Sequence, residues 1–121
     1  MTVSSYRDLV VWQKAMDLLV ECYRACDRFP KAEMFGLCSQ LQRSAVSVPA
    51  NIAEGHGRHS TREYLQHLRI AHGSLVEAET HIAIAERLQY LEVETAQRLQ
   101  DRSAEIGRMI NGLISSLRNK M

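Results

Sequence analysis

The residues of this chain whose types and spacing could support chemistry are concentrated between positions 40 and 72. Five polar side chains are separated by four, three, four and three positions: Gln40, Ser44, Ser47, Asn51 and Glu54. On an α-helix this spacing places all of them on one face. A solvated face usually carries lysine, arginine and glutamate, whereas this one has small uncharged groups and a single carboxylate. We therefore expect the polar stripe, as we call these five residues, to be buried in the subunit, at an interface or at a ligand site.

The most basic window of the sequence follows the stripe, from Gly55 to His72. It holds four histidines and three arginines, and Glu63 is its only carboxylate. Arginines beside the free backbone amides of a helix N-terminus bind anions, including the phosphates of nucleic acids. The alternative is a solvated loop, since short basic windows are common. The candidate ligands for nucleic acid are Arg43, Arg58, Arg62 and Arg69.

Two glutamate–histidine pairs raise the question of a metal centre. Glu63 with His67, and Glu77 with His81, are both spaced by four residues in the same helical segment. A di-iron site in a four-helix bundle needs Glu-x-x-His, a spacing of three, on each of two helices. That pattern occurs nowhere in the chain. We interpret the pairs as surface ion pairs or hydrogen bonds, and expect no metal.

The chain has three cysteines, Cys22, Cys26 and Cys38, and Cys38 could lie near the other two across the first turn. A structural zinc site needs four ligands and usually a Cys-x-x-Cys pair, which is missing. Cysteine is among the most commonly buried residue types, so we favour core packing over a metal or redox role. An odd number of cysteines, with no apolar leader segment, predicts reduced thiols and a cytoplasmic location.

Motifs for enzymatic chemistry are missing from the sequence. It has no Ser-His-Asp order, nucleophile elbow, Walker loop or dinucleotide fingerprint, so we expect no enzymatic activity and no cofactor. The formal net charge of +1 provides no overall attraction to nucleic acid, and any such binding needs a local patch. No apolar run approaches the ~18 residues that would span a bilayer, so we expect no membrane partner.

Four helical segments are predicted to position these residues, at about 8–27, 32–54, 60–88 and 93–118. In each segment the apolar residues recur at alternating spacings of three and four. Pro30 ends the first segment, because the residue before a proline avoids the helical conformation. Short connections between four such helices favour an antiparallel up-down bundle, here an all-α single domain over residues 1–121.

The second segment carries Pro49 in its interior. Proline leaves the carbonyl of Ala45 without its amide partner and costs about 3 kcal/mol in an ordinary helix. We expect a kink here, with Ser44, Ser47 or a water covering that carbonyl. Gly55 and Gly57 are predicted to stop the helix, and Gly55 can adopt the left-handed cap conformation. The next segment opens with Ser60-Thr61-Arg62-Glu63, which is typical of a capping box with reciprocal bonds between its first and last residues.

Two adjacent apolar stripes run along the first segment. One comprises Leu9, Trp12, Met16, Leu19, Tyr23 and Cys26, and the other Val11, Ala15, Leu18, Cys22 and Ala25. A helix with one buried face needs only one stripe. We therefore expect part of this wide face to form an oligomer interface, with Val11, Trp12, Leu18 and Cys22 as its candidate residues.

Three segments of the chain carry a resemblance to a known family. They are Asp8–Ala15 with the pair Phe29-Pro30, the core Gln40–Gly55, and Ala71–Thr80, and within the core the segment Pro49–Gly55 is specific. The sequence resembles the "four helix bundle protein" family, which includes proteins encoded in intervening sequences of bacterial 23S ribosomal RNA genes. His72 stands where the family often has arginine or lysine. The resemblance covers most of the chain.

The resemblance implies a four-helix bundle able to assemble as a ring of five. A related protein, the accessory variability protein of diversity-generating retroelements, is such a ring and binds nucleic acid and a reverse transcriptase. Our hypothesis is a non-enzymatic homo-oligomeric scaffold or adaptor, a pentamer on the resemblance, that engages RNA or DNA, or an RNA-processing protein, through a basic rim. The alternatives are a purely structural protein–protein interaction module, and a small-ligand binder that uses the polar stripe.

Overall fold

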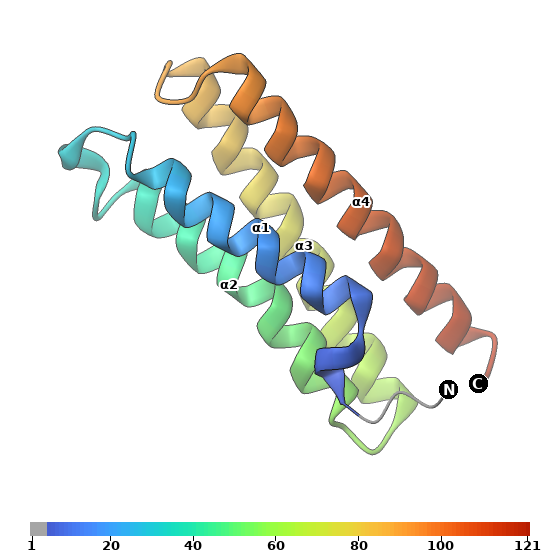
Figure 1. Cartoon of the computed structure of the whole chain (residues 1–121). Coiled ribbons are helices and arrows are strands. Elements are labelled where there is room, and N and C mark those ends of the chain that lie inside the picture. Colours follow the sequence, from blue (N-terminus) through green and yellow to red (C-terminus); the bar gives the residue numbers. More distant parts are fainter. Residues whose placement is uncertain (1–4) are drawn as a thin grey trace.

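A computed structural model describes residues 5–121 as four long helices and two short 3-10 turns (Figure 1). The long helices are α1 (Val10–Cys26), α2 (Leu37–His56), α3 (Thr61–Arg87) and α4 (Val93–Arg118). The short turns are η1 (Tyr6–Asp8) and η2 (Lys31–Glu33). Successive long helices run antiparallel, and the described residues contain no strand. The predicted all-α four-helix bundle is confirmed, and its helix boundaries differ from the predicted ones by a few residues.

The core lies along the middle of the bundle and is built by one apolar stripe from each helix. On α1 that stripe is Val11, Ala15, Leu18 and Cys22, with exposed fractions of 3%, 1%, 1% and 0%. The prediction of an oligomer interface is therefore wrong for Val11, Leu18 and Cys22, because their side chains are buried within the subunit. Trp12 alone of the four predicted residues is partly exposed, and its ring meets Tyr6 of η1 edge-on at 5.2 Å between centroids.

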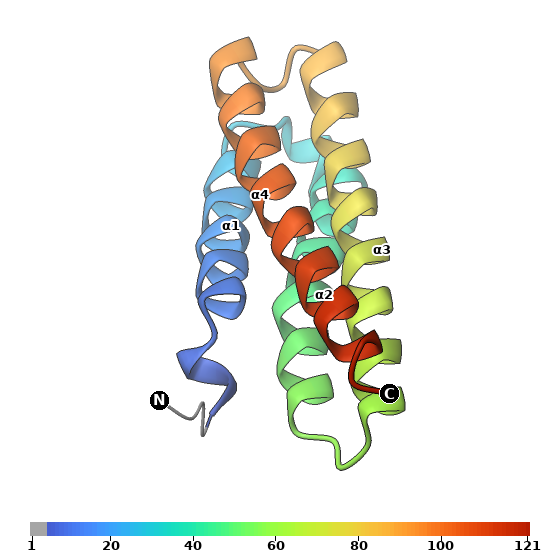
Figure 2. The same ribbon diagram turned by 90° about the vertical axis from the view of Figure 1, so that its right-hand side faces the viewer.

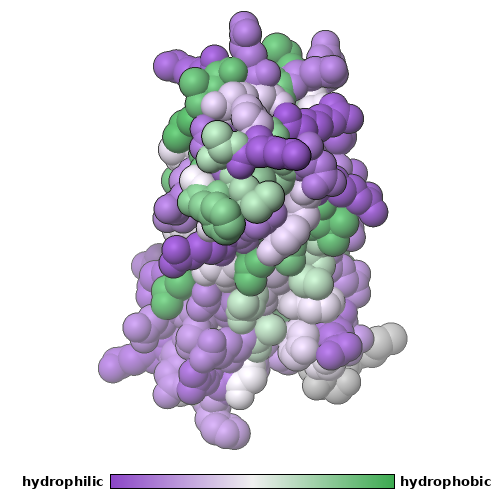
Figure 3. Space-filling model, turned by 90° about the vertical axis from the view of Figure 1, so that its left-hand side faces the viewer, coloured by the Kyte–Doolittle hydropathy of each residue, from purple (hydrophilic) through white to green (hydrophobic). Residues whose placement is uncertain are grey.

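The other stripe of α1 forms the edge of the core and part of the surface. Leu9, Trp12 and Leu19 pack against the core yet stay partly exposed, whereas Tyr23 is 45% exposed. Figure 3 shows apolar side chains reaching the surface in the upper and middle parts of the face on which the α1–α2 connection lies. Of the four predicted interface residues, only Trp12 belongs to this partly exposed stripe.

Helix α2 continues through Pro49 as a single element, and the proline is buried. The Ser44 hydroxyl lies 3.1 Å from the Gln40 carbonyl and 3.0 Å from the Leu41 carbonyl, so it is engaged away from Ala45. The Ser47 hydroxyl accepts hydrogen bonds from Asn51 and Ser74. The kink expected at Pro49 stays a prediction.

Gly55 lies inside α2, which ends at His56, and no glycine has a positive φ among the described residues. The expected left-handed cap is therefore wrong. A Cβ on Gly55 would sit 2.7 Å from the Cβ of His67 and 3.0 Å from the Cδ1 of Tyr64. The glycine is needed because α3 passes too close to α2 for any side chain at this position.

Within residues 5–121, no helix combines the length and the apolar composition that crossing a bilayer requires.

Candidate functional site

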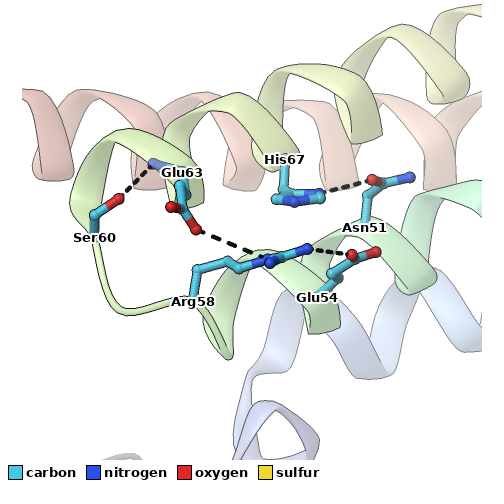
Figure 4. Close-up of polar contacts among 6 residues, drawn as sticks. All are labelled: Asn51, Glu54, Arg58, Ser60, Glu63 and His67. Atoms are coloured by element: carbon cyan, nitrogen blue, oxygen red, sulfur yellow. Dashed lines mark hydrogen bonds and ion pairs between the residues drawn. The ribbon is translucent and has the colours of Figure 1, made fainter.

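The polar stripe of α2 faces α3, and its central residues bond across the seam between the two helices. The Oδ1 of Asn51 lies 3.1 Å from the Nδ1 of His67 (Figure 4), and the Oγ of Ser74 donates to the Oγ of Ser47 at 2.7 Å. The Nδ2 of Asn51 donates to the carbonyl and hydroxyl of Ser47. Since the amide nitrogen is fixed by that carbonyl, Oδ1 must accept, and His67 carries a proton on Nδ1.

The remaining stripe residues lie in different surroundings. Ser44 is buried and bonds to its own helix, while Gln40 and Glu54 are exposed at the two ends. The stripe is thus a packing seam at its centre rather than one continuous ligand surface. Its hydrogen-bonding groups at Ser47 and Asn51 are already used within the subunit, which weakens the small-ligand hypothesis.

Arg58, which lies in the α2–α3 loop, contacts two carboxylates. Its Nη2 lies 2.6 Å from the Oε1 of Glu54, and its Nε lies 4.0 Å from the Oε2 of Glu63 (Figure 4). Glu63 is also the last residue of the predicted capping box. Its amide donates to the Ser60 hydroxyl at 3.1 Å, as expected, but its carboxylate faces Arg58 instead of returning to the Ser60 amide. Arg58 is therefore a partly neutralised member of the predicted basic window.

The other three predicted arginines do not lie together. Arg43 borders a groove of about 340 Å³ on the α1–α2 side, with Tyr23 and Val46. Arg62 and Arg69 are exposed on α3, and their spacing of seven puts them on one helical face. The structure therefore groups two of the four candidates and separates Arg43 from them.

The C-terminal part of α4 adds basic residues beside Arg62 and Arg69. Hydrogen bonds from Gln100 and Ser103 to Glu79 fix the antiparallel register of α3 and α4. This register places the last turns of α4 beside the first turns of α3 (Figure 2). The exposed basic residues of these two adjacent segments are Arg62, Arg69, Arg108, Arg118 and Lys120, and we call them together the basic α3/α4 face.

Carboxylates are scarce in the two segments that form this face. The segments 64–76 and 106–121 contain no aspartate or glutamate. Within residues 5–121, none of the five residues of the basic α3/α4 face forms an ion pair, whereas Lys14, Arg98 and Arg102 are all paired between α1 and α4. The sequence analysis missed the α4 residues, although the acid-free C-terminal segment was a signal that could have found them.

The glutamate–histidine pairs do not build a metal site. The Nε2 of His81 lies 3.7 Å from the Oε2 of Glu77, a contact that becomes an ion pair only when the imidazole is protonated. His67 contacts Asn51 rather than Glu63. The part of the chain that the structure describes contains no group of three or more histidine, cysteine or acidic side chains placed to hold a metal.

The three cysteines are free and buried. Burial, with a smaller contribution from the Glu21 carboxylate, raises the pKa of Cys22 to about 12. A thiol with such a pKa stays protonated near neutral pH and is a poor nucleophile. This burial agrees with the packing role expected from the sequence.

Comparison with known proteins identifies the family. A family model described as "23S rRNA-intervening sequence protein" matches residues 7–112. The chain belongs to this family. The resemblance inferred from the sequence is confirmed. The comparison with curated proteins gives no match.

A solved structure is similar to this chain over most of its length. It is a protein of unknown function from the S23 ribosomal protein family of Bacteroides thetaiotaomicron VPI-5482. The two chains are 25% identical, with a TM-score of 0.79, over 87% of this chain and 98% of the other. The match extends over nearly the whole bundle, so the arrangement of α1–α4 is shared with this solved protein.

Proposed function

We propose that this protein is a non-enzymatic, homo-oligomeric adaptor that binds RNA or DNA through the basic α3/α4 face. The observation that carries the proposal is a set of five exposed, unpaired cationic side chains on or just after two adjacent helices, whose segments 64–76 and 106–121 contain no aspartate or glutamate. Four of the five are arginines, whose planar guanidinium groups bind phosphate oxygens with two hydrogen bonds. The name of the family, which refers to ribosomal RNA genes, is consistent with this class of partner.

The expected binding is electrostatic and tolerant of sequence. Contacts to phosphates position a nucleic acid without reading its bases. The face offers no exposed aromatic ring among its five residues on which a base could stack. The affinity of one subunit therefore comes from a handful of phosphate contacts and falls steeply as salt rises.

Assembly of several subunits is the second part of the proposal. The partly exposed stripe of α1 and the groove beside Tyr23 and Val46 form an apolar surface, and we assign a second copy of this chain to it. Repeating the basic face around an oligomer links weak contacts, which raises avidity ~100-fold or more when the geometry permits simultaneous binding. A ring of five is favoured by the resemblance.

Free cysteines support the cytoplasmic location that belongs to this proposal.

The test is fluorescence anisotropy with labelled single-stranded and double-stranded RNA at low and physiological salt. The double variant Arg62→Glu/Arg69→Glu reverses two charges of the basic α3/α4 face. Arg28→Glu/Arg87→Glu is the matched control, because it reverses two exposed charges at the opposite end of the bundle. We expect the wild type to bind at low salt, the double variant to bind much more weakly, and the control to change little. If the folded, assembled wild type does not bind at low salt, the protein-only scaffold replaces this proposal.

A further inference from the structure

Two of the three cysteines face each other where α1 ends and α2 begins. Cys26 is the last residue of α1, and Cys38 is the second residue of α2. The Sγ of Cys26 donates to the carbonyl of Cys38 at 3.8 Å, and the Sγ of Cys38 donates to the carbonyl of Cys26 at 3.7 Å. This reciprocal arrangement brings the two thiol groups into the same small space.

A pocket of about 250 Å³ leads to this pair. Both cysteines line it, and its other walls come mainly from the α1–α2 connection, including Asp27, Lys31 and Met34. Cys22 differs, since its side chain is completely buried in the bundle core. A small reagent that enters the pocket therefore meets Cys26 and Cys38 together.

We propose that Cys26 and Cys38 are a modification site that forms a reversible intramolecular disulfide by exchange with a low-molecular-weight disulfide such as oxidised glutathione. The thiolate of one cysteine attacks a sulfur of the reagent, which breaks the reagent's S–S bond and releases one glutathione thiol. The second cysteine then attacks the resulting mixed disulfide, forms the protein S–S bond and releases the second glutathione. The protein loses two protons and two electrons, and the reagent takes up both and is reduced to two thiols.

The disulfide would constrain the α1–α2 connection. It would tie the end of α1 to the start of α2 and close a short loop that includes η2 and the highly exposed Phe35. Cross-linking restricts the unfolded chain, so the oxidised protein is expected to melt at a higher temperature. Burial and, second, the hydrogen bond with Cys38 raise the pKa of Cys26 well above its usual value. The exchange is therefore slow at neutral pH and faster as the pH rises, because only the thiolate attacks.

The experiment treats the full, folded chain with excess oxidised glutathione at pH 8, then denatures it and measures its mass and free thiols. We expect one free thiol to remain, the protein mass to fall by two hydrogens, and peptide mapping to join the Cys26 and Cys38 peptides. Cys22→Ser is the matched control and should form the same bond. Cys26→Ser and Cys38→Ser should instead gain a glutathione or stay reduced.

Peptide mapping of the wild type keeps the test decisive if a variant does not fold. A product that carries only glutathione adducts, a bond that includes Cys22, or disulfide-linked dimers without the Cys26–Cys38 peptide would each overturn the proposal. A chain that keeps all three thiols free after prolonged incubation at pH 9 would overturn it as well.

Discussion

The imidazole Nδ1 of His67 lies 3.1 Å from the side-chain oxygen of Asn51, and this contact joins α3 to α2 in the middle of the polar stripe. Asn51 is fixed from the other side by the carbonyl and hydroxyl of Ser47. One side chain thus satisfies groups on its own helix and on the neighbouring one. The stripe that looked in the sequence like a surface for a partner is, at this point, part of what aligns the two helices.

Replacing Asn51 by leucine tests this role. The change removes the acceptor for His67 and the donor for Ser47, and leaves polar groups in the seam without partners. We expect the free energy of unfolding to fall by about 1–3 kcal/mol. Gln40→Leu is the matched control, because Gln40 is an exposed stripe residue, and it should change stability by less than about 0.5 kcal/mol. Equal effects in urea denaturation would show that the seam contributes nothing specific.

Gly55 allows a second test of the α2–α3 contact. In Gly55→Ala the new methyl group would lie 2.7 Å from the Cβ of His67, so the helices must separate. We expect destabilisation by about 1–3 kcal/mol in thermal or urea unfolding. Gly112→Ala is the control, since nothing lies within 4 Å of its added Cβ. It should be neutral or stabilising by up to ~1 kcal/mol, because alanine is the better helix former. A neutral Gly55→Ala would contradict the close approach.

The raised pKa of Cys22 predicts that the protein loses stability at alkaline pH. Burial raises its pKa from 9.0 to about 12, so between these values the unfolded chain releases a proton that the folded chain keeps. The free energy of unfolding should therefore fall as the pH rises above about 9, by up to ~1.4 kcal/mol per pH unit for this group. Cys22→Ala should flatten the slope by that amount, whatever its effect at pH 7. An unchanged slope in denaturation curves from pH 8 to 11 would contradict the assignment.

The helices could be predicted from the sequence because apolar spacing, Pro30 and the Ser60 cap each mark them locally. Which face of α1 points into the core could not be predicted from the sequence. Both of its stripes have the same period, and only the packing of the other three helices selects the one with Ala15 and Leu18 for the core. Gly55 was misinterpreted for a related reason, because a glycine near a helix end suggests a cap, while its real constraint comes from α3.

The candidate site was harder to predict because a surface is assembled from separate segments. A window along the sequence grouped Arg58 with Arg62, but could not show that Glu54 and Glu63 approach Arg58. It also could not relate Arg108 to Arg69, whose segments become adjacent only through the antiparallel pairing of α3 and α4. Local sequence therefore identified the basic character of the region, and tertiary structure decided which charges belong to it.

Self-association is tested at Tyr23. Its side chain is 45% exposed beside the apolar groove, so Tyr23→Glu should leave the subunit core intact while placing a charge in the proposed interface. We expect the wild type to sediment as a closed oligomer at micromolar concentration and the variant to shift towards monomer. Val93→Glu is the control, because Val93 is 63% exposed at the start of α4 and lies outside this surface. A wild type that remains monomeric would contradict the assembly proposal.

The contribution of α4 to nucleic-acid binding is tested by salt dependence. Each phosphate that an arginine neutralises releases condensed counterions and adds roughly 0.7–0.9 to the slope of log K against log salt. Arg108→Ala and Arg118→Ala should each lower that slope by about this amount per subunit, and equally for different RNA sequences. Arg87→Ala is the control, since Arg87 lies at the opposite end of α3 beside Glu86 and Glu92. If Arg87→Ala lowers the slope as much as Arg108→Ala, the charge of the whole subunit, rather than the basic α3/α4 face, attracts the nucleic acid.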